Sequence, residues 1–411
     1  MRVRRVETWS RTPRSAAVER EVAAIIAEVG EGGDAAVLEL TERFDRAELR
    51  PERLQVDERE LEASVGVLEP DVLAAIRTAI GNVRAVAEAQ LREPAAAELP
   101  DGQRVEIAEP PVGRVGLYVP GGRAAYPSTV VMLAVTARTA SVPEIAVCAP
   151  PGPRGEAHPG ILAACVLCGV TEVYRMGGAQ AIAALALGTE SVPAVDVIAG
   201  PGNAYVQEAK RQLFGTVGID GLQGPSELVV VATVPADPEP IALDLLAQAE
   251  HGEESPLWVV SPDAALLDAV GQAVQRLAGE RPSAADAELQ LVRAPDARAA
   301  VRIADEIAPE HLELVGEEAE ALAGRVQRAG CLFVGAAAGT AFGDYVAGSN
   351  HVLPTGGAAR FQSALSPATF RRRMARVSLP GEAAARLAPA GAALARAEGF
   401  PVHAESMEHR A

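Results

Sequence analysis

The sequence predicts an α/β protein in which helices cover parallel sheets. From Val115 onward, short runs of β-branched residues alternate with runs that place apolar residues at helical spacing. This alternation is typical of β-α-β units, which form parallel sheets. Glycine-rich turns follow several of the expected strands, at the edge where open α/β sheets bind ligands. With 411 residues, 49% of them hydrophobic, the chain can bury a sizeable core and form two or more domains.

The helical and extended runs can be placed along the chain from their apolar spacing. Before Val115 the chain is expected to be mostly helical, with apolar residues at a period near 3.6 in 16–29, 34–44 and 70–91. The expected strands then are 115–119, 144–148, 172–176, 196–199, 228–232, 257–260 and one within 330–335. The expected helices between them are 128–141, 158–168, 179–187, 204–213, 240–249 and a helical stretch that ends near Gly279. Beyond Arg360 the sequence predicts a helical tail with a thin apolar face.

The charge and hydropathy of the chain exclude several classes of protein. A net charge of -18 argues against nucleic acid or an anionic membrane surface as a partner. No apolar run reaches the length of about 20 residues that a membrane span needs, and the N-terminus lacks the hydrophobic stretch of a signal peptide. We therefore expect a cytoplasmic protein.

The cysteines and the single lysine carry no chemistry in this interpretation. Cys165 and Cys168 have the spacing of a redox motif, but they lie in an apolar run that predicts the buried, Gly-ended part of a helix. Cys331 is expected in a buried strand with no polar neighbour to activate a thiolate. Lys210 is the only lysine, so a Schiff base or a lysine-containing phosphate loop has almost no candidate residue. We expect Lys210 on the solvent face of an amphipathic helix.

Four of the six histidines lie in polar segments flanked by glycine or acidic residues: His251, His311, His351 and His403. Imidazole and carboxylate donors gathered from distant segments suit a metal such as zinc. Gln248 and His251 are three residues apart on an expected helix and share one face, as two ligands of one ion must. A pair with this spacing is as often simply a solvated polar face.

The adjacent pair Glu310 and His311 suggests proton transfer. Pro309 precedes it, and proline favours the first position of a helix, so both residues are expected in a first helical turn. There the helix dipole disfavours an imidazolium, which would leave His311 neutral and able to accept a proton. The competing interpretation is that Glu310 only complements the helix dipole.

Three glycine-rich turns follow expected strands: Pro120-Gly121-Gly122, Gly177-Gly178-Ala179-Gln180 and Gly200-Pro201-Gly202-Asn203. Each could let backbone N–H groups approach a phosphate at a helix N-terminus. None is a complete G-x-G-x-x-G, so each turn alone is weak evidence. Three such turns on one sheet edge are better evidence for a ligand site.

Taken together, these segments resemble the histidinol dehydrogenase family over nearly the whole chain. The resemblance rests on Val115-Gly-Leu-Tyr-Val-Pro-Gly-Gly122, Gly177-Gly-Ala-Gln-Ala-Ile-Ala-Ala-Leu-Ala186, Gly200-Pro-Gly-Asn-Ala-Tyr-Val206, Gly224-Pro-Ser-Glu227, Gln248-Ala-Glu-His-Gly252, Ala308-Pro-Glu-His-Leu-Glu313, Gly343-Asp-Tyr345 and Asn350-His-Val-Leu-Pro-Thr355. The chain departs from the family pattern at Gly221 and Gln223, where the family usually has a longer apolar residue and a small one. We expect this difference to affect local loop packing and not the chemistry.

The resemblance implies a zinc-dependent enzyme that uses NAD to oxidise L-histidinol through L-histidinaldehyde to L-histidine, the last step of histidine biosynthesis. It implies the catalytic residues Glu310 and His311 and the zinc ligands Gln248, His251, Asp344 and His403, with Asp344 on a glycine-rich loop. It implies NAD contacts at Tyr118, Gln180 and Asn203, and substrate contacts at Ser226, His351 and Glu398 beside His311 and the zinc ligands.

The resemblance also implies a domain organisation and a homodimer. We expect two Rossmann-like parallel-sheet domains, a helical N-terminal segment and a small helical C-terminal tail domain. The boundaries are 1–20 for the N-terminal segment, 21–115 with 225–365 for the domain with the zinc and catalytic residues, 116–224 for the NAD-contacting domain, and 366–411 for the tail. The tails are expected to be exchanged across the dimer, so that each serves the neighbouring chain's site.

Other functions remain compatible with the residues. A related dehydrogenase of the same superfamily could act on a different small alcohol, but it would lose the imidazole-binding residues. A zinc hydrolase could use the same histidines and carboxylates around a metal-activated water, and it would turn over without NAD. A non-catalytic binding protein would leave the Glu310–His311 pair without a role.

Overall fold

The computed structural model describes residues 1–5, 15–121, 125–284 and 287–411. Gly122 of the first glycine-rich turn therefore lies outside the described residues. The chain forms two compact units: Met1–Gln90 with Gly113–Thr369, and Leu91–Val112 with Phe370–Ala411. In the described part of the chain, no helix is long and apolar enough to cross a membrane.

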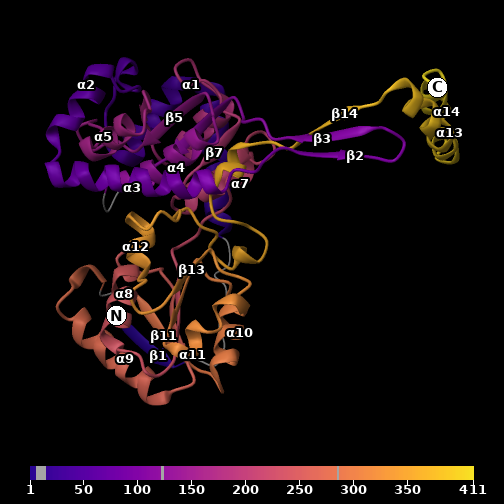
Figure 1. Cartoon of the computed structure of the whole chain (residues 1–411). Helices are drawn as coiled ribbons and strands as arrows, with labels where there is room; N and C mark the ends of the chain where they lie inside the picture. Colours follow the sequence, from indigo (N-terminus) through magenta and orange to yellow (C-terminus); the bar gives the residue numbers. More distant parts are fainter. Residues whose placement is uncertain (6–14, 122–124, 285–286) are drawn as a thin grey trace. The chain divides into compact units, whose positions relative to one another are not determined.

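A five-stranded parallel sheet with the strand order β6-β5-β4-β7-β8 lies in the first unit. Figure 1 labels its strands β5 and β7. The strands are mostly buried runs of Val, Ile, Leu and Ala, as expected for a sheet with helices on both faces. The predicted alternation of strands and helices from Val115 to Leu213 is confirmed. The strands are β4 (Arg114–Tyr118), β5 (Glu144–Ala149), β6 (Glu172–Arg175), β7 (Val197–Ala199) and β8 (Gly218–Ile219), and the helices are α4 (Pro127–Thr139), α5 (Pro159–Leu167), α6 (Gly178–Leu187) and α7 (Ala204–Leu213).

A six-stranded parallel sheet with the order β1-β11-β10-β9-β12-β13 also lies in the first unit. Its N-terminal strand β1 is absent from the sequence prediction because three of its four residues are arginines. At the sheet edge the exposed side chains of Arg2 and Arg4 are tolerated, while Val3 packs against the core. The strands are β1 (Arg2–Arg5), β9 (Leu228–Ala232), β10 (Leu257–Ser261), β11 (Glu288–Arg293), β12 (His311–Val315) and β13 (Cys331–Val334), and the helices are α8 (Pro238–Ala249), α9 (Ala264–Ala278), α10 (Ala297–Ile307), α11 (Glu317–Glu320) and α12 (Thr340–Tyr345).

The N-terminal helices α1 (Ala16–Asp45), α2 (Glu58–Ala63) and α3 (Pro70–Ala89) pack on helices α4 to α7, which lie between the strands of the five-stranded sheet in the chain. Val22 and Leu40 of α1 share one core with Ile182 of α6. The expected domain boundaries join 21–115 with 225–365, whereas α1 shares its core with residues of the five-stranded sheet. Apolar periodicity shows which face of a helix is buried, but not which sheet covers that face.

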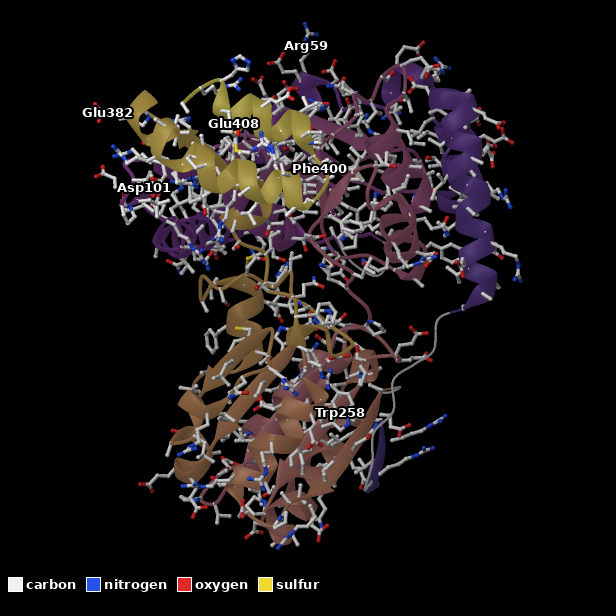
Figure 2. All side chains as sticks on the ribbon, turned by 90° about the vertical axis from the view of Figure 1, so that its right-hand side faces the viewer. Arg59, Asp101, Trp258, Glu382, Phe400 and Glu408 are labelled. Atoms are coloured by element: carbon white, nitrogen blue, oxygen red, sulfur yellow. The ribbon has the colours of Figure 1, made fainter. Side chains whose placement is uncertain are left out.

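The second unit contains a three-stranded antiparallel sheet and a pair of helices. The sheet has the order β14-β3-β2 and consists of β2 (Ala95–Glu98), β3 (Arg104–Ala108) and β14 (Met374–Ser378). Helices α13 (Gly381–Ala397) and α14 (Pro401–Glu408) pack through small residues such as Ala392 and Ala404 (Figure 2, yellow, with Phe400 and Glu408 labelled). The predicted helical tail is thus confirmed for α13 and α14, but it is wrong for the strand β14. Residues 91–112 also belong to this unit.

Short 3-10 helices connect the larger elements of the first unit and lead into the second. They are η1 (Pro51–Arg53), η2 (Ser64–Val67), η3 (Pro282–Ala284), η4 (Ala323–Arg325), η5 (Ala358–Arg360) and η6 (Pro367–Phe370).

The cysteines of α5 have the structural role that their apolar surroundings predict. Cys165 is buried within α5, and Cys168 is the C-cap of this helix, followed by Gly169 with a φ of 73°. Burial raises the pKa of the Cys165 thiol well above its ordinary value and that of Cys168 to about 12. Both thiols are therefore protonated and unreactive near neutral pH.

Lys210 is fully buried, so its predicted place on the solvent face of a helix is wrong. Its ammonium group forms an ion pair with Asp220 and donates hydrogen bonds to Gly200 and Gln223. Asp220 directly follows β8, and the loop that begins there covers the polar face of α7. A helical pattern cannot show such a cover, because it comes from a different part of the chain.

Two carboxylates, the buried Glu313 of β12 and the half-buried Asp244 of α8, interact with each other. Glu313 is 2% exposed, and its Oε1 accepts a hydrogen bond of 2.9 Å from the N–H of Thr340 at the start of α12. Its Oε2 has no hydrogen-bond partner among the described residues. Burial, and then the charge of Asp244, raise the pKa of Glu313 to about 8, and burial raises that of Asp244 to about 6. Folding therefore favours a protonated Glu313.

We predict that Glu313→Gln makes the protein less sensitive to alkaline pH. A carboxyl group with a raised folded-state pKa binds more protons in the folded than in the unfolded state, so wild-type stability falls as pH rises from about 4.5 to about 8. Glutamine keeps an acceptor for Thr340 and cannot ionise. At pH 8 the variant should be more stable by about 1 kcal/mol or more, the equivalent of roughly one pKa unit. Denaturant unfolding at pH 5 and pH 8 measures this.

The matched control is Glu42→Gln, which changes an exposed glutamate of α1. It should leave the difference between the two pH values unchanged. If Glu313→Gln shows the same fall in stability as the wild type, Glu313 is not protonated in the folded protein.

Candidate functional site

The described residues of the three glycine-rich turns lie at the carboxyl edge of the five-stranded sheet. Tyr118 ends β4, Gln180 lies in the first turn of α6, and Asn203 is the N-cap of α7. The buried Tyr118 hydroxyl accepts a hydrogen bond of 3.2 Å from the N–H of Gly178, which connects two of the turns. Asn203 is exposed, and its Oδ1 accepts hydrogen bonds of 3.0 and 3.1 Å from the N–H groups of Tyr205 and Val206.

Two features of this edge could serve a bound ligand. Gln180 is 1% exposed, and its Nε2 has no hydrogen-bond partner among the described residues, so a buried donor is left for a ligand. Gly200 has a φ of 131°, and a Cβ atom there would lie 2.1 Å from the carbonyl oxygen of Tyr118. Only glycine lets the backbone pass this closely, and the following N-termini of α6 and α7 favour an anion such as a pyrophosphate.

Glu310 and His311 lie at the amino end of β12, and the predicted first helical turn is wrong. Helix α10 ends at Ile307, and its C-cap Ala308 has a left-handed conformation with a φ of 54°. Pro309 therefore follows a helix end, which is another position that proline favours. The sequence alone does not distinguish a proline that starts a helix from one that follows a helix.

Parallel pairing of β12 with β9 brings Glu310 to Ser226. His311 is opposite Leu228 in the register, so the residues that precede both strands lie side by side. Oε2 of Glu310 accepts hydrogen bonds from the Ser226 hydroxyl and, at 2.9 Å, from the N–H of Glu227. Nε2 of Gln248 donates to the same Ser226 hydroxyl. Helix α8 runs back to the amino edge of the sheet, which is why Gln248, near its end, meets Ser226.

His311 is 2% exposed and lies between two carboxylates. Its Nδ1 is 3.1 Å from the carbonyl oxygen of Glu227 and 3.5 Å from Oε2 of Glu310. Its Nε2 is 3.6 Å from Oδ1 of Asp344. Burial acts to lower the pKa of His311, but Glu310 and Asp344 outweigh it and raise the pKa well above its ordinary value. His311 starts a strand, so the helix dipole that was expected to act on its imidazole is not present.

The sequence predicts a glycine-rich loop for Asp344, but this residue lies in helix α12. Burial acts to raise the pKa of Asp344, but His311, His351 and His251 together lower it. Nδ1 of His351 is 2.9 Å from the backbone oxygen of Asp344, and its Nε2 is 3.1 Å from the Thr129 hydroxyl. Burial lowers the pKa of His351, which favours its neutral form.

The donor set of the first unit fits a zinc ion in part. Gln248 offers an amide oxygen, His251 an exposed imidazole one turn further along the chain, and Asp344 a carboxylate whose pKa responds to the charge of His251. These are nitrogen and oxygen donors of the kind that zinc binds. Among the described residues, no group of three or more His, Cys, Asp or Glu side chains is arranged to hold a metal.

Glu398 and His403 lie in the second unit, where both are exposed. Glu398 is the C-cap of α13, and His403 lies in α14 with its ring centroid 5.3 Å from that of Phe400. Of the predicted site residues outside the glycine-rich turns, the first unit thus brings together seven: Ser226, Gln248, His251, Glu310, His311, Asp344 and His351.

Sequence reasoning missed two residues of this site. Glu227 supplies the backbone oxygen that contacts His311, and burial raises the pKa of its own carboxyl group to about 7. The motif Gly224-Pro-Ser-Glu227 contained a signal, because an acidic residue directly before a buried strand is unusual. Thr129 gave no signal, since its contact with His351 joins residues that are far apart in the sequence.

Comparison with known proteins identifies the family. The family model for histidinol dehydrogenase matches residues 10–411. The chain is 44% identical to a histidinol dehydrogenase of Synechococcus over 97% of this chain and 94% of that protein. It is 46% identical to one of Cereibacter sphaeroides over 96% of this chain and 92% of that protein.

A solved structure agrees with these matches. The fold matches a crystal structure of histidinol dehydrogenase from Elizabethkingia anophelis with a TM-score of 0.94 and 30% sequence identity, covering 100% of this chain and 98% of that one. The chain therefore belongs to the histidinol dehydrogenase family, and it is an enzyme of the dehydrogenase class.

Proposed function

We propose that this enzyme oxidises L-histidinol through L-histidinaldehyde to L-histidine with NAD, in a zinc-dependent reaction that completes histidine biosynthesis. The observation that carries the proposal is His311, buried between Glu310 and Asp344 beside the hydroxyl of Ser226. We expect this enzyme in the cytoplasm, because the proposed reaction belongs to amino-acid biosynthesis.

His311 is the base in this proposal. It accepts the proton of the substrate hydroxyl, and later that of the aldehyde hydrate, each time a carbinol C–H bond is oxidised. Glu310 and Asp344 stabilise the imidazolium that forms, which is why they raise the pKa of His311. The backbone oxygen of Glu227, 3.1 Å from Nδ1, fixes the orientation of the ring.

Glu310 activates the water of the second half-reaction. Its carboxylate accepts a proton from water while the water oxygen bonds to the aldehyde carbon, and the imidazolium of His311 returns a proton to the carbonyl oxygen, which gives the hydrate that is then oxidised. The hydrogen bonds from Ser226 and from the N–H of Glu227 hold the carboxylate in place. Ser226 in turn accepts a hydrogen bond from Gln248, so Glu310 and one proposed metal ligand belong to one hydrogen-bonded group.

Gln248, His251, Asp344 and His403 would hold zinc, and Ser226, His351 and Glu398 would contact histidinol together with His311. Zinc, when bound, would anchor the imidazole and amino nitrogens of the substrate. The first unit supplies Gln248, His251 and Asp344. In our proposal, Glu398 and His403 come from the tail of the neighbouring chain of a homodimer, because a two-fold assembly lets each tail complete the other site.

Tyr118, Gln180 and Asn203 would contact NAD at the carboxyl edge of the five-stranded sheet. NAD, when bound, would accept the hydride of each oxidation step. The unpaired Nε2 of Gln180 and the close backbone approach at Gly200 support this placement.

The direct test is the number of NADH molecules formed for each histidinol consumed. The proposed oxidation to histidine requires two, since two hydrides leave the same carbon in turn. Chelation should stop turnover and leave NADH binding intact, because the two sites use different residues. A ratio of one would mean that the aldehyde is the product, and turnover without NADH formation would indicate a hydrolase.

Glu310→Gln should slow the second oxidation more than the first. Only hydration of the aldehyde requires a base for water, and such a base contributes about 100-fold or more. Stopped-flow absorbance resolves the two phases of NADH formation. His311→Asn serves as the comparison, because it should slow both phases. Equal slowing of the two phases by Glu310→Gln would contradict the role proposed for this carboxylate.

Two inactive variants should restore activity when their subunits are exchanged. A dimer of Glu310→Gln and His403→Ala chains contains one site with an intact body and an intact tail if the tails are exchanged. Random re-pairing makes half of the dimers mixed, so about a quarter of wild-type activity should return. Activity after verified subunit exchange measures this, with each variant alone as the control. No recovery would mean that each tail serves its own chain.

A further inference from the structure

The only lysine of the chain forms a buried network beneath one of the glycine-rich turns. Lys210 and Asp220 are 0% and 1% exposed at their side chains and form an ion pair. The ammonium group also donates hydrogen bonds of 3.1 Å to the carbonyl oxygen of Gly200 and 3.0 Å to Oε1 of Gln223. All three donor positions of the ammonium group are therefore used.

The ion pair satisfies both backbone polar groups of Gly200. Lys210 binds its carbonyl oxygen, while Oδ2 of Asp220 accepts its N–H at 2.8 Å. Gly200 has a conformation that other residues rarely adopt, with a φ of 131°. A residue held from both sides in this way cannot rotate its peptide groups without breaking a hydrogen bond to a charged partner.

The network continues from this turn to the loop that leads into Ser226. The N–H of Gln223 donates to Oε1 of Gln207 at 2.7 Å, and Nε2 of Gln207 donates to the carbonyl oxygen of Gly202 at 3.4 Å. Gln223, which departs from the family pattern, is thus bound to Lys210 and Gln207 at once. The loop that begins at Asp220 reaches Ser226 three residues after Gln223.

Stability alone does not explain a buried ion pair at this position. Burial acts to lower the pKa of Lys210, and the charge of Asp220 opposes this effect. Removing two charges from water is costly, so apolar residues of similar volume are often equally stabilising. What apolar residues cannot replace is the pair of directed hydrogen bonds to Gly200.

We propose that Lys210 and Asp220 are positioning residues for the dinucleotide, which hold the Gly200 turn so that Asn203 and the N-terminus of α7 are in place for NAD. Gln223 connects this turn to the loop of Ser226. The inference rests on the proposed NAD-dependent function. Lys210 then acts on NAD indirectly, because it holds the Gly200 backbone and does not contact the cofactor.

The test compares the buried pair of Lys210 and Asp220 with a partly exposed group of charges at the other edge of the five-stranded sheet. The double variant Lys210→Met/Asp220→Leu removes both charges together and leaves no unpaired buried ion. The control is Arg114→Met, because Arg114 pairs with Glu144 and Glu172 at the amino edge, away from the glycine-rich turns. Fluorescence titration of the purified, zinc-loaded full chain with NADH gives the dissociation constant, and thermal unfolding gives the stability.

We expect the double variant to bind NADH at least tenfold more weakly, and to raise the KM for NAD while the KM for histidinol changes less than threefold. Arg114→Met should bind NADH within twofold of the wild type whatever its stability. NADH binding by the folded double variant within twofold of the wild type would overturn the inference. An equal loss in Arg114→Met would do so too, because it would show a general effect of stability.

A second variant keeps the inference testable if the double variant does not fold. Asp220→Asn keeps the volume of the side chain but replaces one acceptor oxygen with an N–H₂ group, so either the N–H of Gly200 loses its acceptor or Lys210 loses one of its three. It should weaken NADH binding threefold or more, and unchanged binding would reject the role of Asp220. Wild-type protein that binds no NADH would instead reject the proposed function itself.

Discussion

The parallel pairing of β9 with β12 is the constraint on which the catalytic residues depend. Because His311 lies opposite Leu228, the two segments that precede these strands must run side by side at the amino edge of the sheet. This places Glu310 against Ser226 and the N–H of Glu227, and His311 against the carbonyl oxygen of Glu227. A shift of the register by one residue would separate all of these contacts, since it would turn every side chain to the other face.

The two sheets use opposite edges for the two parts of the proposed reaction. The glycine-rich turns lie at the carboxyl edge of the five-stranded sheet, the usual ligand edge of an open α/β sheet. Glu310 and His311 lie at the amino edge of the six-stranded sheet, where α8 returns with Gln248. The hydrogen bond between Thr129 and His351 connects α4, a helix of the five-stranded sheet, with the segment that follows α12.

Buried charge is concentrated where this chain needs a fixed geometry. Glu310, His311 and Asp344 form one such group, and Lys210 with Asp220 forms another beneath Gly200. In each group the charged atoms accept or donate several directed hydrogen bonds, which offset part of the cost of removing them from water. Apolar packing could fill the same volume, but it could not orient an imidazole ring or a peptide group.

The sequence by itself determined the alternation of strands and helices, because apolar periodicity and glycine-rich turns are local properties. Its motifs also pointed to the family, since the glycine-rich turns, Glu310–His311 and the dispersed histidines are contiguous or short patterns. Only the tertiary structure decided which sheet the N-terminal helices cover, that Pro309 follows a helix instead of starting one, and that Lys210 is buried. Each of these depends on a partner from a distant part of the chain, and local spacing carries no information about such partners.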